Sequence, residues 1–360
     1  MVIQQINMKM QKIFNRYAAI SAVIAAIAFT LSGCGGGGGG GSNSCPACNT
    51  NTGTTVDQNV TIITTPPTAP TYANEELAVY NMINAARSQC GFGYLSQNSS
   101  LDTAARAHNL YMAENDSTAH SETLGNPGYT GSTYLLRELA AGYPGLSAGS
   151  TEDEINFYGT SNKTGFGTIA ATAWLTAPYH LRATMIGARE FGISVFSTDH
   201  TGTADYVNPT GPIGLASTVD FGTTATLLPQ QQSSSSILTY PCQGVTNTGY
   251  KLTNESPSPV PGRDLSTNPI GQPIFIQAAP GVQLVITSVA VTGPAGSVAL
   301  LPTMTSANDP NYDLNANQAF IIPSAPLLPN TTYSVTITGT SNGTVFTQIN
   351  FSFTTGSIAT

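Results

Sequence analysis

The sequence predicts an α+β domain followed by an all-β sandwich, with a segment ahead of both that has no core of its own. Apolar residues recur at helical spacing from residue 74 to about residue 175, and short alternating runs typical of strands follow from residue 191. After about residue 250 the sequence shows strand patterns without any helical period. Helices followed by an antiparallel sheet indicate packed layers of helix and sheet in the first domain.

Four helices are predicted in the first domain from apolar spacing and from start and stop signals. Asn74 can cap the first helix, which ends near Cys90, and Ser100 can cap the second. His108 lies on the apolar face of the second helix, so we predict a buried histidine that is hydrogen-bonded within the core. The predicted helices cover residues 74–90, 100–112, 133–141 and about 167–175.

Alternating apolar residues predict strands in both domains. In the first domain they cover residues 191–197 and 214–221. In the second domain, Asn342-Gly343 separates two alternating runs and is typical of a hairpin turn. The runs of the second domain, residues 282–291, 333–337 and 345–353, predict a small β-sandwich.

The N-terminus has the pattern of a bacterial export signal that ends in a lipid attachment site. Three basic residues precede an apolar run over residues 17–31, which is too short for a stable membrane-spanning helix. Leu31-Ser32-Gly33-Cys34 follows directly and resembles the bacterial lipobox, in which the cysteine is acylated. We therefore expect cleavage before Cys34 and a covalent lipid on it.

The segment after Cys34 has the composition of a tether. It is rich in Gly and then in Thr and Pro, and such a composition cannot offset the entropy of ordering, so we expect disorder. The chain as a whole then divides into five parts. These are a signal peptide over residues 1–33, a tether over 34–72, a first domain over 73–230, a linker over 231–249 and a β-sandwich over 250–360.

The charge balance excludes some partners. Removal of residues 1–33 takes away Lys9, Lys12 and Arg16 and no acidic residue, which leaves 8 Lys and Arg against 19 Asp and Glu. The mature chain therefore has a net charge of −11, which argues against nucleic acid as a partner and against a basic patch that binds lipid head groups. A link to the membrane must then depend on the acyl chains at Cys34.

Four of the five cysteines are left for disulfides if Cys34 carries lipid. Cys45 and Cys48 have the spacing of a redox or zinc motif, but they lie in the tether without a second ligand pair, so a local bridge is favoured. We therefore pair Cys90 with Cys242, although four cysteines allow three connectivities and the sequence alone does not choose among them.

An ordered series of short motifs gives the first domain a family resemblance. The series contains Leu101, His108 and Met112, Ala119-His120-Ser121, Arg137 with Gly142-Tyr143, Glu154-Ile155-Asn156, Trp174 with Pro178-Tyr179-His180-Leu181-Arg182, and Phe191-Gly192-Ile193. Over about residues 73–225 the chain resembles the CAP superfamily of cysteine-rich secretory, antigen-five and pathogenesis-related (SCP-like) proteins, in its bacterial form. The resemblance implies an α-β-α sandwich with a central cleft.

The second domain resembles a bacterial immunoglobulin-like module. The similarity lies in residues 327–333 and 351–355, Leu-Leu-Pro-Asn-Thr-Thr-Tyr and Phe-Ser-Phe-Thr-Thr. Such modules commonly act as spacers, so the resemblance implies a spacer.

The CAP resemblance also implies a cleft with two histidines and two acidic residues that can bind a divalent metal ion. His120 matches the first histidine, His180 the second and Glu154 one acid, with Glu152 or Asp153 in its place if the alignment shifts. The second acid would fall near Ala177, which cannot bind a metal ion, so a metal would have an incomplete shell. Two imidazoles and a carboxylate suit zinc, but hydrogen bonds within the cleft can satisfy the same groups.

Three functions follow as hypotheses. The first is a non-catalytic surface lipoprotein of the bacterial cell envelope whose cleft binds a lipid, a peptide or an envelope ligand. The second is a metal-dependent hydrolase of envelope polymers or peptides that uses His120, Glu154 and His180. The third is a structural or adhesive protein with a vestigial cleft. Gly35 after the acylated cysteine lacks the acidic residue associated with inner-membrane retention, so we expect the outer membrane.

Overall fold

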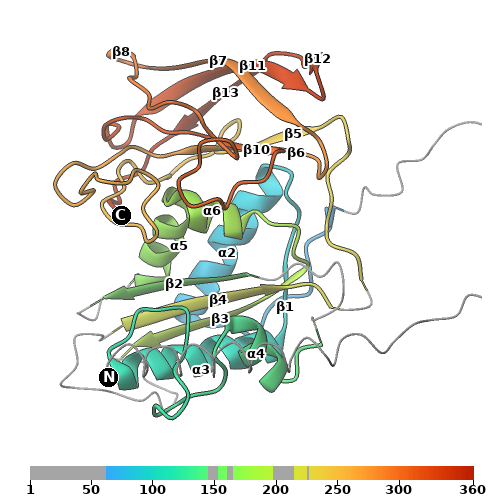
Figure 1. Ribbon diagram of the computed structural model, residues 1–360, viewed down its shortest axis with the longest axis vertical. Helices are drawn as coiled ribbons and strands as arrows, with labels where there is room; N and C mark the ends of the chain where they lie inside the picture. Colours follow the sequence, from blue (N-terminus) through green and yellow to red (C-terminus); the bar gives the residue numbers. More distant parts are fainter. Residues whose placement is uncertain (1–61, 145–152, 160–164, 198–214, 225–226) are drawn as a thin grey trace, which may run out of the picture. The chain divides into compact units, whose positions relative to one another are not determined.

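The computed structural model describes residues 62–144, 153–159, 165–197, 215–224 and 227–360 (Figure 1). The predicted signal peptide, Cys34, the Cys45–Cys48 pair and most of the predicted tether lie outside the described residues. Within the described part of the chain, no helix is both long enough and apolar enough to cross a membrane.

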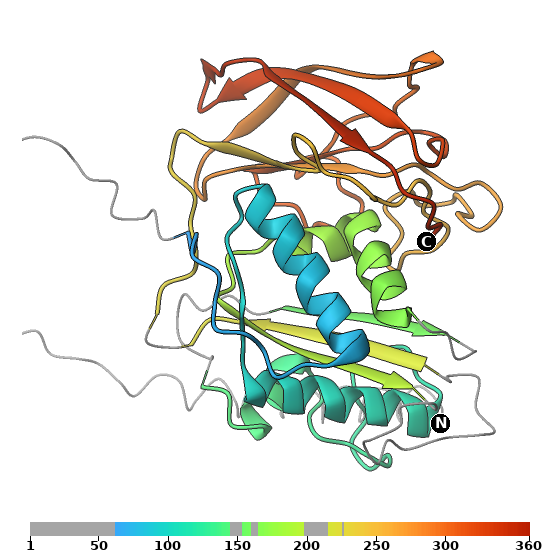
Figure 2. The ribbon, with the colours of Figure 1, turned by 180° about the vertical axis from the view of Figure 1, so that it is seen from behind.

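The first domain is an α-β-α sandwich around a four-stranded sheet. The strand order is β1-β3-β4-β2, with β1 parallel to β3 and the other pairs antiparallel. Helices α3 and α4 cover one face of this sheet, while α2, α5 and α6 cover the other (Figures 1 and 2). The elements are α2 Asn74–Gln89, β1 Ser96–Gln97, α3 Ser99–Asn115, α4 Tyr134–Ala140, β2 Asp153–Gly159, α5 Phe166–Thr176, α6 Pro178–Thr184, β3 Glu190–Ser197 and β4 Leu215–Gly222.

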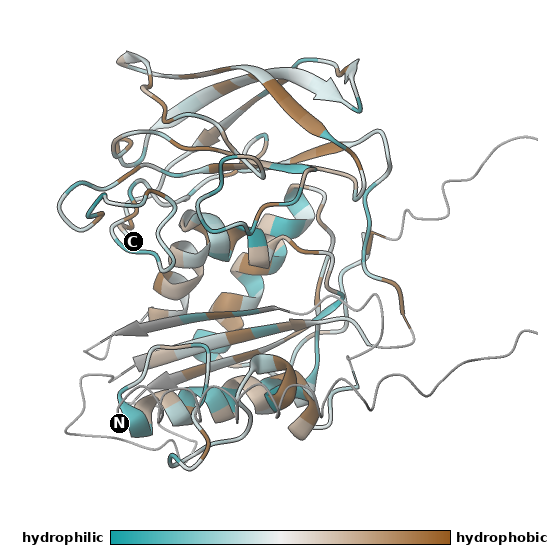
Figure 3. Cartoon of the chain, viewed as in Figure 1, coloured by the Kyte–Doolittle hydropathy of each residue, from teal (hydrophilic) through white to brown (hydrophobic). Residues whose placement is uncertain are grey.

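The predicted helices and strands of this domain are present, with small differences at their starts. Ala73 rather than Asn74 is the N-cap of α2, and Asn98 rather than Ser100 is the N-cap of α3. The Asn98 side chain accepts hydrogen bonds from the backbone N–H groups of Ser100 and Leu101, as a cap should. Hydrophobic and hydrophilic residues alternate along α3, which buries one face against the sheet (Figure 3).

Two elements beside the cleft were not predicted. Helix α6 has only seven residues, too few to show an apolar period, and Pro178 opens it at a position where a missing N–H costs nothing. Strand β2 begins in the acidic run Glu152-Asp153-Glu154, whose composition is more typical of a loop than of a strand.

The C-terminal part forms two antiparallel sheets packed as a sandwich, as the sequence predicts. One sheet has the order β5-β6-β10-β9, and the other has the order β12-β11-β7-β8 with β13 beside β11. Asn342 and Gly343 both have positive φ and form the predicted hairpin turn. The strands are β5 Ile237–Tyr240, β6 Ile274–Ala278, β7 Leu284–Gly293, β8 Gly296–Ser297, β9 Met304–Thr305, β10 Gln318–Ile321, β11 Thr332–Ser341, β12 Thr344–Val345 and β13 Ile349–Thr354.

The sandwich packs on the layer of α2, α5 and α6, so residues 55–360 belong to one unit. Phe92, after α2, stacks on Phe275 of β6 with ring centroids 6.2 Å apart. The predicted disulfide between Cys90 and Cys242 is present and joins the same two regions. Strand β5 lies within residues 231–249, the segment predicted as a linker, and pairs with β6.

We expect the Cys90–Cys242 disulfide to be a major source of stability. It closes a loop of 152 residues, for which chain entropy gives a contribution of up to about 5 kcal/mol. The double variant Cys90→Ala/Cys242→Ala should lower the free energy of unfolding by an amount approaching this value, as measured by urea denaturation. As a control, Cys45→Ala/Cys48→Ala removes only a short predicted loop and should cost much less; equal losses in the two variants would contradict the expectation.

Candidate functional site

The structure brings the three predicted cleft residues together from three different segments. His120 lies in the loop after α3, Glu154 on β2 and His180 on α6. All three line a cavity of about 140 Å³. The two histidines also line an adjacent cavity of about 700 Å³. Glu154 lines the smaller cavity, while Glu152 and the side chain of Asp153 lie outside the described part of the structure.

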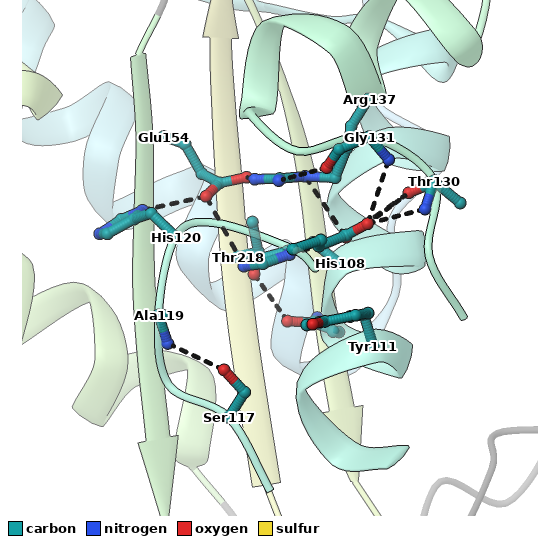
Figure 4. A network of polar contacts seen from close by, with 12 residues as sticks. His108, Tyr111, Ser117, Ala119, His120, Thr130, Gly131, Arg137, Glu154 and Thr218 are labelled. Atoms are coloured by element: carbon teal, nitrogen blue, oxygen red, sulfur yellow. Dashed lines mark hydrogen bonds and ion pairs between the residues drawn. The ribbon is translucent and has the colours of Figure 1, made fainter. Parts of the chain in front are cut away.

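Glu154 binds a different partner with each of its oxygens (Figure 4). Oε1 lies 3.0 Å from Nδ1 of His120, and Oε2 accepts a hydrogen bond from Nη2 of Arg137 on α4. Burial alone would raise the pKa of Glu154, but His120, His108 and Arg137 together lower it below its usual range. The carboxylate is therefore ionised and only accepts, so Nδ1 of His120 donates to it and Nε2 points to the other side of the ring.

His108 is fully buried on α3, as predicted, but its neighbours are charged. Its Nδ1 lies 3.0 Å from Oε1 of Glu122, and its Nε2 lies 3.3 Å from Nδ2 of Asn156 and 3.7 Å from Oε1 of Glu154. Nδ1 of His108 can thus donate to Glu122, while Nε2 lies within reach of the Asn156 amide. His108 links the acidic residue of the cleft to a second buried carboxylate.

Glu122 and Arg137 complete this buried network. Oε2 of Glu122 accepts hydrogen bonds from the backbone N–H groups of Thr130 and Gly131, and Oε1 lies 3.7 Å from Nε of Arg137. Burial raises the pKa of Glu122, but these contacts and His108 outweigh it and the pKa is lowered. One guanidinium therefore serves two buried carboxylates, which fixes the loop that carries His120 between α3 and α4.

Asp220 stands opposite Glu154 on the neighbouring strand β4 and is also fully buried. Among the described residues, neither of its carboxyl oxygens has a hydrogen-bond partner. Burial and the nearby carboxylates of Glu154 and Glu138 raise its pKa well above the usual range. Asp220 is therefore protonated where Glu154 is ionised.

His180 has a carboxylate partner that the sequence did not reveal. Its Nδ1 lies 3.2 Å from Oε1 of Glu255, which also accepts a 2.7 Å hydrogen bond from the backbone N–H of Tyr179. Glu255 comes after the first domain, whereas the resemblance placed a second acid near Ala177. Ala177 is the N-cap of α6 and has no side chain that can accept, so Glu255 takes over both tasks, capping the helix and holding the histidine.

These contacts decide how well the cleft fits a metal ion. Each histidine has one ring nitrogen beside a carboxylate, and Glu154 itself is committed to Arg137 and to histidine N–H groups. In the described part of the chain, no three His, Cys, Asp or Glu side chains are placed to hold a metal ion. A catalytic zinc site needs three protein ligands, so these residues do not fit one. The metal at His120 and His180 stays a prediction, and no step below passes through it.

We expect Asp220→Asn to stabilise the protein at neutral pH. The folded state holds a proton on Asp220 that the unfolded chain releases above about pH 4, so the stability that Asp220 contributes falls as the pH rises beyond that value. The variant cannot ionise and can donate to Glu154. Its advantage in urea denaturation should grow by up to about 1.4 kcal/mol per pH unit above pH 4 and vanish below it.

The exposed Asp264 is the matched control for this experiment. Hydrogen bonds from Ser266 and Thr267 lower the pKa of Asp264, so Asp264→Asn should lose stability at neutral pH rather than gain it. An Asp220→Asn variant whose relative stability does not change between pH 4 and pH 8 would show that Asp220 ionises normally.

Comparisons with known proteins support the assignment of the first domain. Residues 80–207 match the family model described as CAP, the cysteine-rich secretory protein family. Among solved structures, an outer surface protein from Borrelia burgdorferi is 19% identical, with the similarity covering 42% of this chain and 92% of that chain at a TM-score of 0.31. No curated protein matches the chain. The family match over residues 80–207 and the α-β-α sandwich together support a CAP-like first domain.

Proposed function

We propose that the protein is an extracytoplasmic surface protein whose CAP cleft binds a small amphipathic ligand of the lipid class. The cavity of about 700 Å³ carries this proposal, because its volume lies in the range of small-molecule sites. Ile169, Ala173 and Trp174 of α5 form an apolar wall. His120 and His180 add polar atoms at the same cavity. The apolar wall would contact the acyl chain of an amphipathic ligand, and the histidines would contact its polar head group.

The proposed location outside the cytoplasm rests on a disulfide and on a predicted lipid attachment site. The Cys90–Cys242 disulfide suits an oxidising compartment outside the cytoplasm. The predicted export signal and lipid site at Cys34 agree with this, and the acyl chains would hold the protein at a cell-envelope membrane, with the outer membrane expected from Gly35. A lipid-class ligand would then lie within reach of the anchored protein.

Binding needs only groups that the cleft has in place. The two histidines, each oriented by a buried carboxylate, offer polar ring atoms, and α5 offers apolar surface. The alternative of a metal-dependent hydrolase needs a third metal ligand, for which the described residues supply no candidate. We therefore favour ligand binding.

We expect Ala173→Leu to weaken ligand binding at least about tenfold, equivalent to about 1.4 kcal/mol, because the larger side chain would fill part of the cavity. The measurement is isothermal titration calorimetry with 1-monododecanoylglycerol below its micelle-forming concentration. The protein is the exported full chain carrying Cys34→Ser, which removes the predicted lipid and leaves every described residue unchanged.

Ala140→Leu, on the exposed surface of α4, is the control and should leave the affinity unchanged. Failure of the parent chain to bind the probe, or equal affinity in the Ala173→Leu and parent chains, would overturn the proposed function.

A further inference from the structure

Glu255 has one oxygen that is fully occupied and one that is not. Oε1 accepts from the backbone N–H groups of Tyr179 and His180 and from Nδ1 of His180. Oε2 has no hydrogen-bond partner among the described residues, although the Glu255 side chain is 0% exposed. A buried polar atom without a partner costs free energy, so its persistence calls for a group that can satisfy it.

The cavity that Glu255 lines is the one assigned to the ligand. Glu255 and His180 lie on its wall together with His120, Asn156 and Trp174. A ligand bound there would therefore lie beside the carboxyl group that lacks a partner. The orphaned oxygen and the cavity are independent observations that indicate the same place.

The polar groups that line this cavity are carboxyl, imidazole, amide and hydroxyl groups. Nδ1 of His120 and Nδ1 of His180 face the carboxylates of Glu154 and Glu255. No Lys or Arg occurs among the described residues that line the 700 Å³ cavity. Arg182 lines only the smaller cavity, and its Nε donates to Gln318. An anionic head group would thus meet a carboxylate without a cation beside it.

We propose that the bound amphipath carries a hydroxyl or ammonium group that donates a hydrogen bond to Oε2 of Glu255, which makes the cleft select donor head groups over anionic ones. The inference rests on the proposed function and names the ligand class for the same site. It also assigns a binding residue to the segment that follows the CAP domain, outside residues 80–207.

The test compares two ligands with the same acyl chain in the Cys34→Ser full chain. 1-Monododecanoylglycerol offers hydroxyl donors and dodecanoate offers only a charged acceptor. The parent chain should prefer the monoglyceride. In Glu255→Gln, the side-chain oxygen keeps the backbone N–H groups of α6, so the amide NH2 takes the place of Oε2 and donates into the cavity.

We therefore expect Glu255→Gln to weaken monoglyceride binding by about ten- to a hundredfold, the range for removing one partner of a buried hydrogen bond, and to strengthen dodecanoate binding. The readout is the ratio of the two dissociation constants from calorimetry. A merely structural role for Glu255 would change both constants in parallel and leave the ratio unchanged.

Glu75→Gln is the matched control. Glu75 accepts from the backbone N–H groups of Gly165 and Gly167 at the start of α5, so both of its oxygens are occupied, and it is not among the residues that line the cavity. This variant should lower thermal stability as any lost cap does and leave the ligand ratio at the value of the parent chain.

The outcomes separate the two proposals. A parent chain that binds the monoglyceride but prefers dodecanoate, or a ratio that Glu255→Gln does not change, overturns the inference about Glu255 while the response to Ala173→Leu still supports a binding cleft. Absence of binding by both ligands to the parent chain overturns the proposed function and the inference with it.

Discussion

The buried ion pair between Glu154 and Arg137 is the interaction on which the cleft depends. Both side chains are fully buried, and a buried charge is tolerated only when it is paired and hydrogen-bonded. The pair connects β2 to α4, and the second oxygen of Glu154 holds His120. His120 is 47% exposed and its loop packs little apolar surface, so this carboxylate rather than hydrophobic contact sets the position of the ring.

The second histidine depends on a comparable contact from a distant part of the chain. His180 is 17% exposed and Glu255 is buried beside it, 75 residues later in the sequence. The segment that contains Glu255 leads into the sandwich, which is fixed to the first domain by the Cys90–Cys242 disulfide and by packing such as that of Phe92 on Phe275. The sequence predicts a spacer in this region, whereas the structure shows that the region also supplies one wall of the cleft.

Much of the fold could be predicted because it obeys apolar periodicity. Helices α2, α3 and α5 are long enough to show a buried stripe, and β3, β4 and β11 alternate clearly. The motifs of the CAP resemblance identified His120, Glu154 and His180, which the structure places around one cavity. Helix α6 and strand β2 were missed because they are short and carry the polar residues of the cleft.

The residues that the sequence did not reveal are the charged partners in the interior. Arg137 was noted only as part of a family motif, and Glu122 and Glu255 show no pattern that distinguishes them from solvated acids. Their role depends on contacts between elements far apart in sequence, such as Glu255 with α6 and Glu122 with His108. A single sequence contains no periodicity that reports such pairs, so only the folded chain shows which acids are buried.

The pair of Glu154 and Asp220 explains how the interior holds several acids with one arginine nearby. Two carboxyl groups opposite each other on adjacent strands cannot both ionise at low cost, so one proton is retained between them. Arg137, His108 and His120 all contact Glu154, so the charge stays there and the proton stays on Asp220. This asymmetry keeps Glu154 an acceptor. The ionised Glu154 holds Nδ1 of His120, which turns Nε2 of the ring away from the network.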